Sequence, residues 1–338
     1  MSKITFACAA ALVMSVAWPA YGQDGRIVAQ QPFTLDESLR KDIVTKAEFT
    51  SELKTPKDIF AVIERVEMRE ITYLSDGLRV KGFLLAPKKE GRYPVLIWNR
   101  GGCRESVGVI TRYFAARWLA PFVDWGYVVV ASQYRGTAGG DGKDEFGGAD
   151  VNDVVNLFPI LDSLPGADSS RIGMAGFSRG GLQTYLTLTR TDRVKAAIVA
   201  GGPVDVDFAI DAARRKALGL PKHDLEDFCL RQVLADYDRN RQQIIDARSP
   251  IKWPEKLHKK TPILLLHGTS DWDALPYSPL DMAAALLKLK HPFRLVMLEG
   301  GDHDLVRYDE EVNRVMKAWL DHYVRDGRTW PSLEPPKR

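Results

Sequence analysis

The chain has 338 residues and a formal net charge of +3, with 45% hydrophobic and 27% charged residues. This near balance of charge predicts neither a nucleic-acid-binding surface nor a preference for acidic substrates. The length is sufficient for one large α/β domain with a substantial core.

The first 22 residues have the pattern of a secretory signal peptide. Lys3 is followed by the uncharged stretch ITFACAAALVMSVAWPAYG, and the small residues Ala20 and Gly22 precede Gln23 as they do at a cleavage site. The alternative is a membrane anchor, but the strongly apolar part ends near Trp18, short of the about 20 residues that a span needs. We therefore expect cleavage and export, to the periplasm or the medium, with no membrane association of the mature chain.

The rest of the chain divides into three parts in sequence order. Residues 23–65 form an N-terminal extension with a helix that begins at Thr55, residues 66–324 form a catalytic domain, and residues 325–338 form a tail. The domain opens with an antiparallel hairpin, VEMREITYLS and LRVKGFLLAP, joined through Asp76 and Gly77. Residues 204–261 are predicted to be a helical insertion that walls the pocket, and whether it closes as a lid is left open.

Apolar strands then alternate with helices. The expected strands are YPVLIWNRGG, YVVVASQYRG, RIGMAGF, VKAAIVAGGP, TPILLLHG and FRLVMLEG, and the expected helices are TRYFAARWLAPFVDWG, DVNDVVNLFPILDSL, LQTYLTLTR and EEVNRVMKAWLDHYVRD. Such alternation is typical of a parallel sheet covered on both faces. The sequence predicts an α/β-hydrolase fold with an eight-stranded, mostly parallel sheet and the insertion before the seventh strand.

The sequence GFSRGG, from Gly176 to Gly181, lies between an apolar strand and a helix. This is the context of a G-x-S-x-G nucleophile elbow, in which a strained turn presents a serine and the neighbouring glycines leave room for it. Ser178 is therefore the candidate nucleophile, and it needs a base and an orienting acid.

Two of the six histidines, His267 and His303, follow core strands directly, where ligands meet an open α/β sheet. His303 lies between the last strand and the last helix, the place of the base when the order is Ser, Asp, His. His267 is interpreted as holding its own turn. Asp271, four residues later, is the preferred acid and Asp273 is its rival; the two aspartates that flank His303 are weak candidates.

An oxyanion hole needs two donors. The backbone N–H of Arg179 is one candidate, and the loop Arg100-Gly101-Gly102 is predicted to supply the other. Two roles stay open for the Arg179 side chain: it binds a substrate carboxylate or carbonyl, or it pairs with an acid such as Asp150.

Several motifs together, GFSRGG, YRGTAGGDG, FGGADVNDVVN, SPIKWPEKLHKKTPILLLHGTSD and GGDHD, resemble the catalytic domain of the prolyl oligopeptidase family of serine peptidases over roughly residues 66–324. The resemblance implies that Ser178 is the nucleophile and His303 the base, and that Asp271, in an HG-x-x-D pattern, is the acid. This sequence departs from the family's pattern in two places. The family's larger members place a β-propeller before the catalytic domain, but here about 40 mature residues precede the first strand, too few for one propeller blade. Arg100 also stands where some relatives donate a tyrosine hydroxyl, so a backbone N–H near Gly101 or Gly102 must serve.

We expect a serine hydrolase that forms an acyl-enzyme, first a serine-type peptidase on short peptides. A carboxylesterase or acyl esterase is the alternative within enzymes, because it uses the same machinery, and a non-catalytic binding protein of this fold is the alternative of another class. No metal or organic cofactor is implied, and the sequence indicates no oligomeric state.

Two further sets of residues have open roles. Cys103 and Cys229 fit no metal motif; we expect two buried thiols but leave a disulfide open. The aromatic residues near strand ends are candidates for a substrate pocket or for the core, namely Trp98, Trp118, Trp272 and Tyr277.

Overall fold

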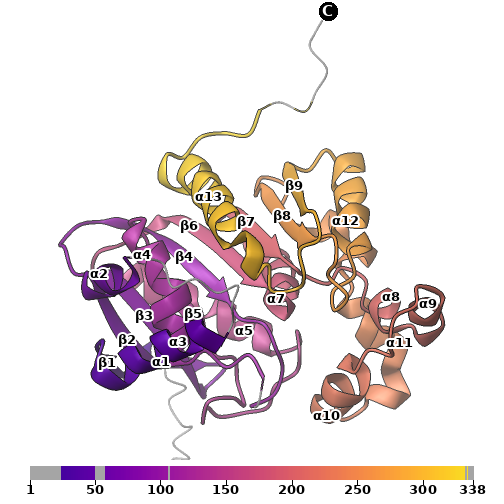
Figure 1. Cartoon of the computed structure of the whole chain (residues 1–338), viewed down its shortest axis with the longest axis horizontal. Coiled ribbons are helices and arrows are strands. Elements are labelled where there is room, and N and C mark those ends of the chain that lie inside the picture. The colour runs from indigo at the N-terminus through magenta and orange to yellow at the C-terminus, as the bar shows by residue number, and fades with distance from the viewer. Residues whose placement is uncertain (1–23, 50–57, 106, 332, 334–338) are drawn as a thin grey trace, which may run out of the picture.

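The computed structural model describes residues 24–49, 58–105, 107–331 and 333, so the predicted signal peptide and the predicted helix start at Thr55 lie outside the described residues. Within these residues nine strands form one sheet, in the order β1-β2-β3-β5-β4-β6-β7-β8-β9 (Figure 1). The strands are β1 (Ile27–Phe33), β2 (Val66–Ser75), β3 (Leu78–Pro87), β4 (Tyr93–Asn99), β5 (Val128–Ser132), β6 (Ala167–Phe177), β7 (Val194–Ala200), β8 (Ile263–Gly268) and β9 (Phe293–Leu298).

The first three strands are antiparallel to their neighbours, and every pair from β5 to β9 is parallel. The predicted α/β-hydrolase fold is confirmed, with one correction to the strand count. Residues 27–33, which we placed in a surface extension, form the edge strand β1. It pairs with β2 and leaves five consecutive residues exposed, so it carries little apolar pattern.

The helices cover both faces of the sheet. The α-helices are α1 (Glu37–Phe49), α2 (Ile59–Glu64), α3 (Arg112–Phe114), α4 (Ala120–Asp124), α5 (Asp150–Val155), α6 (Leu157–Ser163), α7 (Arg179–Leu188), α8 (Val206–Ile210), α9 (Ala212–Ala217), α10 (Arg231–Val233), α11 (Tyr237–Ala247), α12 (Tyr277–Lys288) and α13 (Asp309–Leu320). The π-helical turns are η1 (Ala115–Leu119), η2 (Leu225–Leu230) and η6 (Asp321–Arg325), and the 3-10 turns are η3 (Pro250–Lys252), η4 (Pro254–Lys256) and η5 (Val306–Tyr308).

Each face of the sheet has its own core. Helices α1, α2, α4 and α13 pack on one face, and α5, α6, α7 and α12 pack on the other. Trp319 of α13 is 1% exposed and donates from its indole N–H to the carbonyl of Ala197 on β7, at 3.1 Å. No helix in the described part of the chain combines the length and apolar character that crossing a bilayer requires.

The connections after β4 and before β6 reverse the direction in which strands are added. The chain leaves β4 for β5 on one side and returns to β6 on the other. Ligands of open α/β sheets bind at such a switch point, outside the carboxyl ends of the strands. The loop after Asn99 and the turn at Ser178 therefore meet there.

The segment between β7 and β8 contains α8 to α11 and gathers at the end of the molecule away from β1 and α2 (Figure 1). It has a small core of its own, which includes Val206, Leu230 and Tyr237. A disulfide joins Cys229 of this segment to Cys103 in the loop after β4, with Cα atoms 6.2 Å apart. Our expectation of two free thiols is thereby corrected.

Candidate active site

The turn at Ser178 has the geometry expected of a nucleophile elbow. Ser178 joins β6 to α7 with φ 55° and ψ −127°, a left-handed conformation that side chains rarely adopt. A Cβ atom at Gly180 would collide with the carbonyl of Asn99, and one at Gly176 would collide with the carbonyl of Gly180. Only glycine therefore permits the turn to pack this closely against β4.

The structure brings the three predicted side chains together. His303, in the loop between β9 and α13, places Nε2 2.9 Å from Ser178 Oγ, and its Nδ1 lies 2.8 Å from Asp271 Oδ2. The three residues come from separate loops at the carboxyl end of the sheet, 125 positions apart for Ser178 and His303 and 32 for His303 and Asp271. A continuous hydrogen-bonded chain therefore runs from the Asp271 carboxylate through the imidazole to the Ser178 hydroxyl.

Asp271 is fully buried, and its own loop satisfies its other oxygen. Oδ1 accepts from the backbone N–H groups of Asp273 and Ala274, at 3.0 and 2.9 Å. Burial alone would raise the pKa of Asp271, but hydrogen bonds to His267 and His303 lower it well below its usual range. A carboxylate that stays ionised here stabilises a protonated imidazole.

Burial and the hydrogen bond to Asp271 also shift the pKa of His303, each in the direction opposite to its effect on Asp271. Burial by itself lowers the pKa of His303, but the hydrogen bond to Asp271 and its charge outweigh burial and raise the pKa above that of a free histidine. His267 Nε2 lies 2.7 Å from the carbonyl of Ala274 and 3.0 Å from Asp271, so it holds this turn, the role proposed for it from the sequence.

The rival carboxylates point elsewhere. The side chain of Asp273 is 69% exposed and lies 4.0 Å from His223. Asp302 accepts from the backbone N–H of Leu305 at 2.9 Å, and Asp304 is exposed. Asp273 and Asp304 act on the His303 ring through their charge, which raises its pKa further, whereas Asp271 is the carboxylate hydrogen-bonded to it.

The loop after β4 lies directly over the serine. A Cβ atom at Gly101 would be 3.1 Å from Ser178 Cβ, and Gly102 lines the same cavity as Ser178 and Arg179. The Arg100 side chain turns away: it is 1% exposed and donates to the carbonyls of Gln133 and Gly101, at 2.8 and 2.9 Å. Within Arg100 to Gly102, the donors left to face a substrate oxygen are therefore backbone N–H groups.

The Arg179 side chain is committed to structural contacts. It is 2% exposed and donates to Asp144 at 2.8 Å, Asp150 at 2.8 Å and the carbonyl of Gly102 at 3.0 Å. Burial alone would raise the pKa of Asp144, but the Arg179 guanidinium holds it at about 2. Of the two roles left open, pairing with Asp150 is the one observed, and the guanidinium also ties the elbow to the loop at Gly102.

A cavity of about 250 Å³ opens at Ser178, and we call it the serine cavity. Its walls come from the loop after β4, the elbow and the insertion, including the two disulfide-bonded cysteines. The predicted pocket residues are not among its described lining: Trp98 lines a different cavity, while Trp272 and Tyr277 are 48% and 43% exposed at the surface. Trp272 and Tyr277 thus lie outside the serine cavity, and a substrate-binding role for Trp98 in that other cavity stays a prediction.

Sequence reasoning missed His223, which lines the serine cavity from the insertion. Its Nδ1 accepts from the backbone N–H of Leu225 at 2.9 Å, and burial lowers its pKa. His223 is therefore neutral at physiological pH, with its proton on Nε2. No strand precedes it, so the rule that selected His267 and His303 could not select it.

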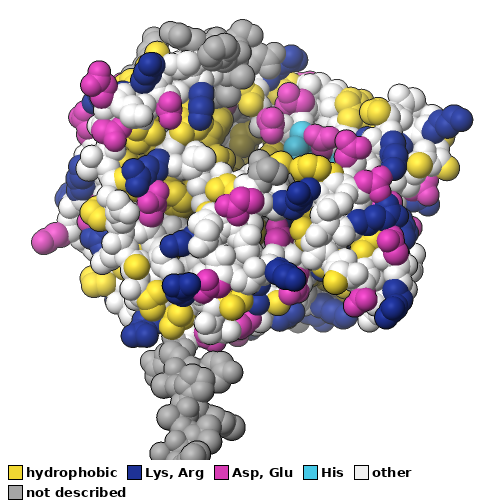
Figure 2. Space-filling view, turned by 90° about the horizontal axis from the view of Figure 1, so that it is seen from below, with side chains coloured by type: hydrophobic (Ala, Val, Ile, Leu, Met, Phe, Trp, Pro, Cys, Tyr) yellow, Lys and Arg dark blue, Asp and Glu magenta, His cyan; other side chains and the backbone are white. Residues whose placement is uncertain are grey.

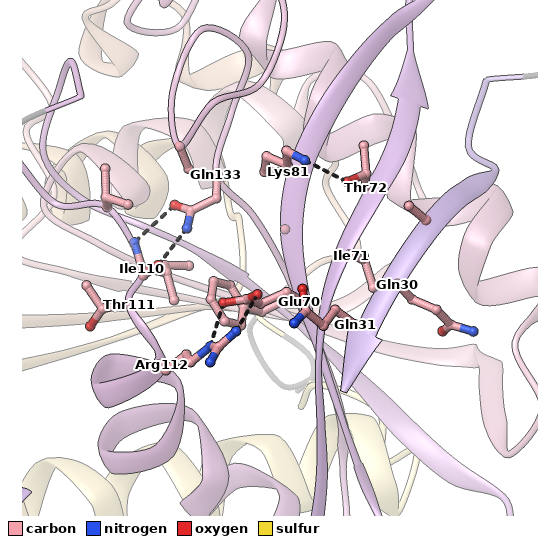
Figure 3. A pocket seen from close by; sticks show the side chains of 15 residues that line it. Gln30, Gln31, Glu70, Ile71, Thr72, Lys81, Ile110, Thr111, Arg112 and Gln133 are labelled. Atoms are coloured by element: carbon pink, nitrogen blue, oxygen red, sulfur yellow. Dashed lines mark hydrogen bonds and ion pairs between the residues drawn. The ribbon is translucent and has the colours of Figure 1, made fainter. Parts of the chain in front are cut away.

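Another cavity, of about 440 Å³, lies away from Ser178, among β1 to β3 and the residues around Ile110 (Figure 3). Arg112 and Glu70 form a paired contact at 2.9 and 3.0 Å, and Gln133 bonds both backbone groups of Ile110, at 3.0 and 2.6 Å. These contacts anchor the far end of the loop that begins at Arg100.

Comparison with known proteins places the chain in a family. A family model described as the prolyl oligopeptidase family matches residues 113–327. The chain belongs to the prolyl oligopeptidase family. It is 33% identical over 208 residues to the uncharacterized peptidase YtmA of Bacillus subtilis (strain 168), which is 62% of this chain and 75% of YtmA.

Two further relatives are longer than this chain. It is 27% identical to the uncharacterized peptidase YuxL of the same organism, over 75% of this chain and 39% of YuxL. The Pyrococcus horikoshii acylaminoacyl peptidase shares the fold with a TM-score of 0.64 and 21% identity, over 80% of this chain and 43% of that one. Family membership makes this prolyl oligopeptidase relative a serine hydrolase, which leaves the non-catalytic alternative without support.

Proposed function

We propose that Ser178, His303 and Asp271 form a catalytic triad that hydrolyses short peptides through an acyl-enzyme. One observation carries this proposal: a single imidazole lies 2.9 Å from the Ser178 hydroxyl and 2.8 Å from a buried carboxylate. Nucleophile, base and orienting acid are then all within hydrogen-bonding distance, as the reaction requires.

The proposed reaction runs in two halves. Ser178 Oγ attacks the substrate carbonyl carbon while His303 Nε2 takes its proton, and the carbonyl oxygen becomes an oxyanion facing the backbone N–H groups of Arg179 and the Gly101–Gly102 loop. The C–N bond breaks as the leaving amine takes the proton from His303. Water then attacks the carbonyl carbon of the acyl-enzyme while His303 Nε2 takes its proton. The ester bond to Ser178 breaks, Ser178 Oγ takes the proton from His303, and the acid is released.

The size of the serine cavity supports short peptides as substrates. Its volume of about 250 Å³ is just below the usual range of small-molecule pockets, about 300 to 1,000 Å³. The insertion forms one wall, and the disulfide ties that wall to the loop after β4. Such a cavity accommodates one side chain rather than a folded segment.

A paired assay tests the proposal. The mature protein should cleave members of a panel of dipeptide and Xaa-Pro amides, and a fluorophosphonate probe should label it, whereas Ser178→Ala should do neither. Turnover of p-nitrophenyl acetate without cleavage of any amide would replace the peptidase by an esterase that uses the same triad. Labelling that persists in Ser178→Ala would remove Ser178 from the mechanism.

We also propose that the protein is exported. The signal-like pattern of residues 1–22 supports this, and so does the Cys103–Cys229 disulfide, because disulfides persist mainly in oxidising compartments. Expression of the full chain in a Gram-negative host should yield periplasmic protein that begins near Gln23 by mass spectrometry. Full-length protein confined to the cytosol would contradict export.

A further inference from the structure

A second cavity, of about 310 Å³, lies beside the catalytic residues, and we call it the aromatic cavity. Its walls include Trp98 at the end of β4, Phe114 and Trp118 before α4, Phe177 at the end of β6, and Val312 on α13. Its opening is on the surface, because Phe114, Trp118 and Val312 are only partly buried. Figure 2 shows, on one face, a hollow lined by hydrophobic side chains, with a histidine and several acidic side chains beside it.

The aromatic cavity and the serine cavity are neighbours. Phe177 lines the aromatic cavity and precedes Ser178, which lines the serine cavity; likewise His303 lines the serine cavity, and Asp304 lines the aromatic one. The Phe177 and His303 rings are in contact, with centroids 5.0 Å apart and planes tilted by 44°. The two catalytic side chains therefore stand at the boundary between two cavities.

The chemistry of the aromatic cavity suits an apolar group without charge. Trp98 packs against the rings of Phe122 and Phe114 at 5.6 and 6.3 Å. Of the polar groups in its lining, Asp309 accepts from Arg117 at 3.2 Å and from Asn313 at 2.7 Å. Asp304 is exposed, and among the described residues the buried Trp98 indole N–H has no hydrogen-bond partner. Burial of aromatic or aliphatic surface is thus the main contribution this cavity can make.

The order of the reaction decides which part of a substrate reaches it. The acyl group and the leaving group project in different directions from the attacked carbon. The leaving group must take its proton from His303 Nε2, so it departs on the imidazole side, where the residues that follow His303, Asp304 to Val306, line the aromatic cavity. The acyl part then occupies the serine cavity, which holds Ser178 and Gly102 near the oxyanion.

We infer that the aromatic cavity binds the leaving group, and that the enzyme prefers peptides whose residue on the amine side of the cleaved bond is large and apolar. The inference rests on the proposed function of Ser178 and His303. It assigns the cavity one occupant, the aromatic or branched aliphatic side chain of that residue.

A matched series of quenched fluorescent peptides tests this inference. The acyl half stays constant, and the leaving-group residue is Gly, Leu or Phe. Because burial of a Leu or Phe side chain raises binding by about 10-fold or more, kcat/KM should be at least about 10-fold higher for Phe than for Gly. Val312→Trp, which fills the cavity, should bring this ratio close to one. Trp118→Ala, which removes a wall, should also lower it.

Two controls make the result decisive. Arg314→Trp adds the same bulk on α13, at a side chain that is 72% exposed, and should keep the wild-type ratio. Fluorophosphonate labelling, whose leaving group is fluoride, reports on Ser178 without using the aromatic cavity. If the probe labels the protein but no peptide is cleaved, the corresponding ratio is measured with the acetate esters of 2-phenylethanol and ethanol.

The outcomes separate the inference from the proposed function. A wild-type ratio near one, or a ratio that Val312→Trp leaves unchanged in labelled, folded protein, overturns the inference while the triad stands. Failure of the fluorophosphonate probe to label the wild-type protein would instead count against the triad itself. If Val312→Trp does not fold, Trp118→Ala decides alone.

Discussion

Replacement of Arg179 by methionine should destabilise the protein strongly and in a pH-dependent way. The guanidinium is 2% exposed and bonds two carboxylates, and the Tyr134 and Phe146 rings lie 5.0 and 4.7 Å from it. Removing one partner of a buried ion pair typically costs about 3 to 5 kcal/mol, because it strands the other charge. Arg179→Met keeps an apolar group between the rings, so the loss measured is electrostatic.

The pKa of Asp144 gives an independent magnitude. Arg179 holds that pKa at about 2, and without the cation burial should raise it above the usual value of an aspartate. Each pKa unit corresponds to about 1.4 kcal/mol, so the lowering of the Asp144 pKa from 3.8 to about 2 by itself contributes roughly 2.5 kcal/mol of stability at neutral pH. In the variant, protonation relieves the cost of the stranded charge as pH falls, whereas the wild type keeps its ion pair down to the folded-state pKa.

Urea unfolding at pH 8 and pH 4 measures the effect. The variant should lose about 3 to 5 kcal/mol at pH 8 and less at pH 4. Adding Asp144→Asn and Asp150→Asn to Arg179→Met removes the stranded charges and should recover most of the loss. A cost below about 1 kcal/mol, or one equal at both pH values, would refute this account of the cluster.

Three further predictions follow from the site and the disulfide. The pKa of His303 is raised and only the neutral ring accepts a proton, so kcat/KM should fall as pH drops, with an apparent pKa above that of free histidine. Asp271→Asn should shift this acidic limb of the pH profile to lower pH and reduce kcat by about 10⁴-fold. An acidic limb that does not shift would contradict the pairing of His303 with Asp271. Reduction of Cys103–Cys229, or replacement of both by alanine, should lower the unfolding free energy by about 2 to 5 kcal/mol in urea, and equal midpoints with and without dithiothreitol would disprove a structural disulfide. Ser178→Gly should be more stable than Ser178→Ala by about 0.5 to 1 kcal/mol, because only glycine adopts φ 55° without strain; the reverse order would show that the turn is unstrained.

The sequence predicts the geometry of the candidate site well because of where its residues lie. Ser178, Asp271 and His303 follow the parallel strands β6, β8 and β9, and the carboxyl ends of such strands meet at one edge of the sheet. Glycines next to the serine mark the sharp turn. Strand position and local turn chemistry together place these side chains within about one side-chain length of each other.

Helix boundaries were harder to predict because proline interrupts them. The helix expected over DVNDVVNLFPILDSL is divided at Asn156 into α5 and α6, three residues before Pro159, whose ring nitrogen cannot donate to the preceding turn. The helix expected before it is divided into α3, the π-helical turn η1 and α4, where Pro121 lies at the second position of α4. The hydrophobic period continues across both breaks.

Side-chain direction at the surface of the site could not be predicted. Cys103 and Cys229 are 126 residues apart, and only the fold of the insertion brings them together. Trp272 and Tyr277 follow the loop of Asp271, yet they turn outward, where Tyr277 stacks on Phe208 at 5.7 Å. Sequence position identifies the edge of the sheet on which a residue lies, but packing against the insertion decides which way it points.

Arg179 combines a backbone position that the sequence predicts with side-chain contacts that it does not. Its backbone N–H belongs to the elbow, which the motif predicts, while its side chain bonds the carbonyl of Gly102 and the carboxylate of Asp144, which no motif predicts. The guanidinium therefore holds the nucleophile turn and the oxyanion loop at a fixed separation. Because oxyanion donors work only when they are already in place, we expect this buried ion cluster to support catalysis as well as stability.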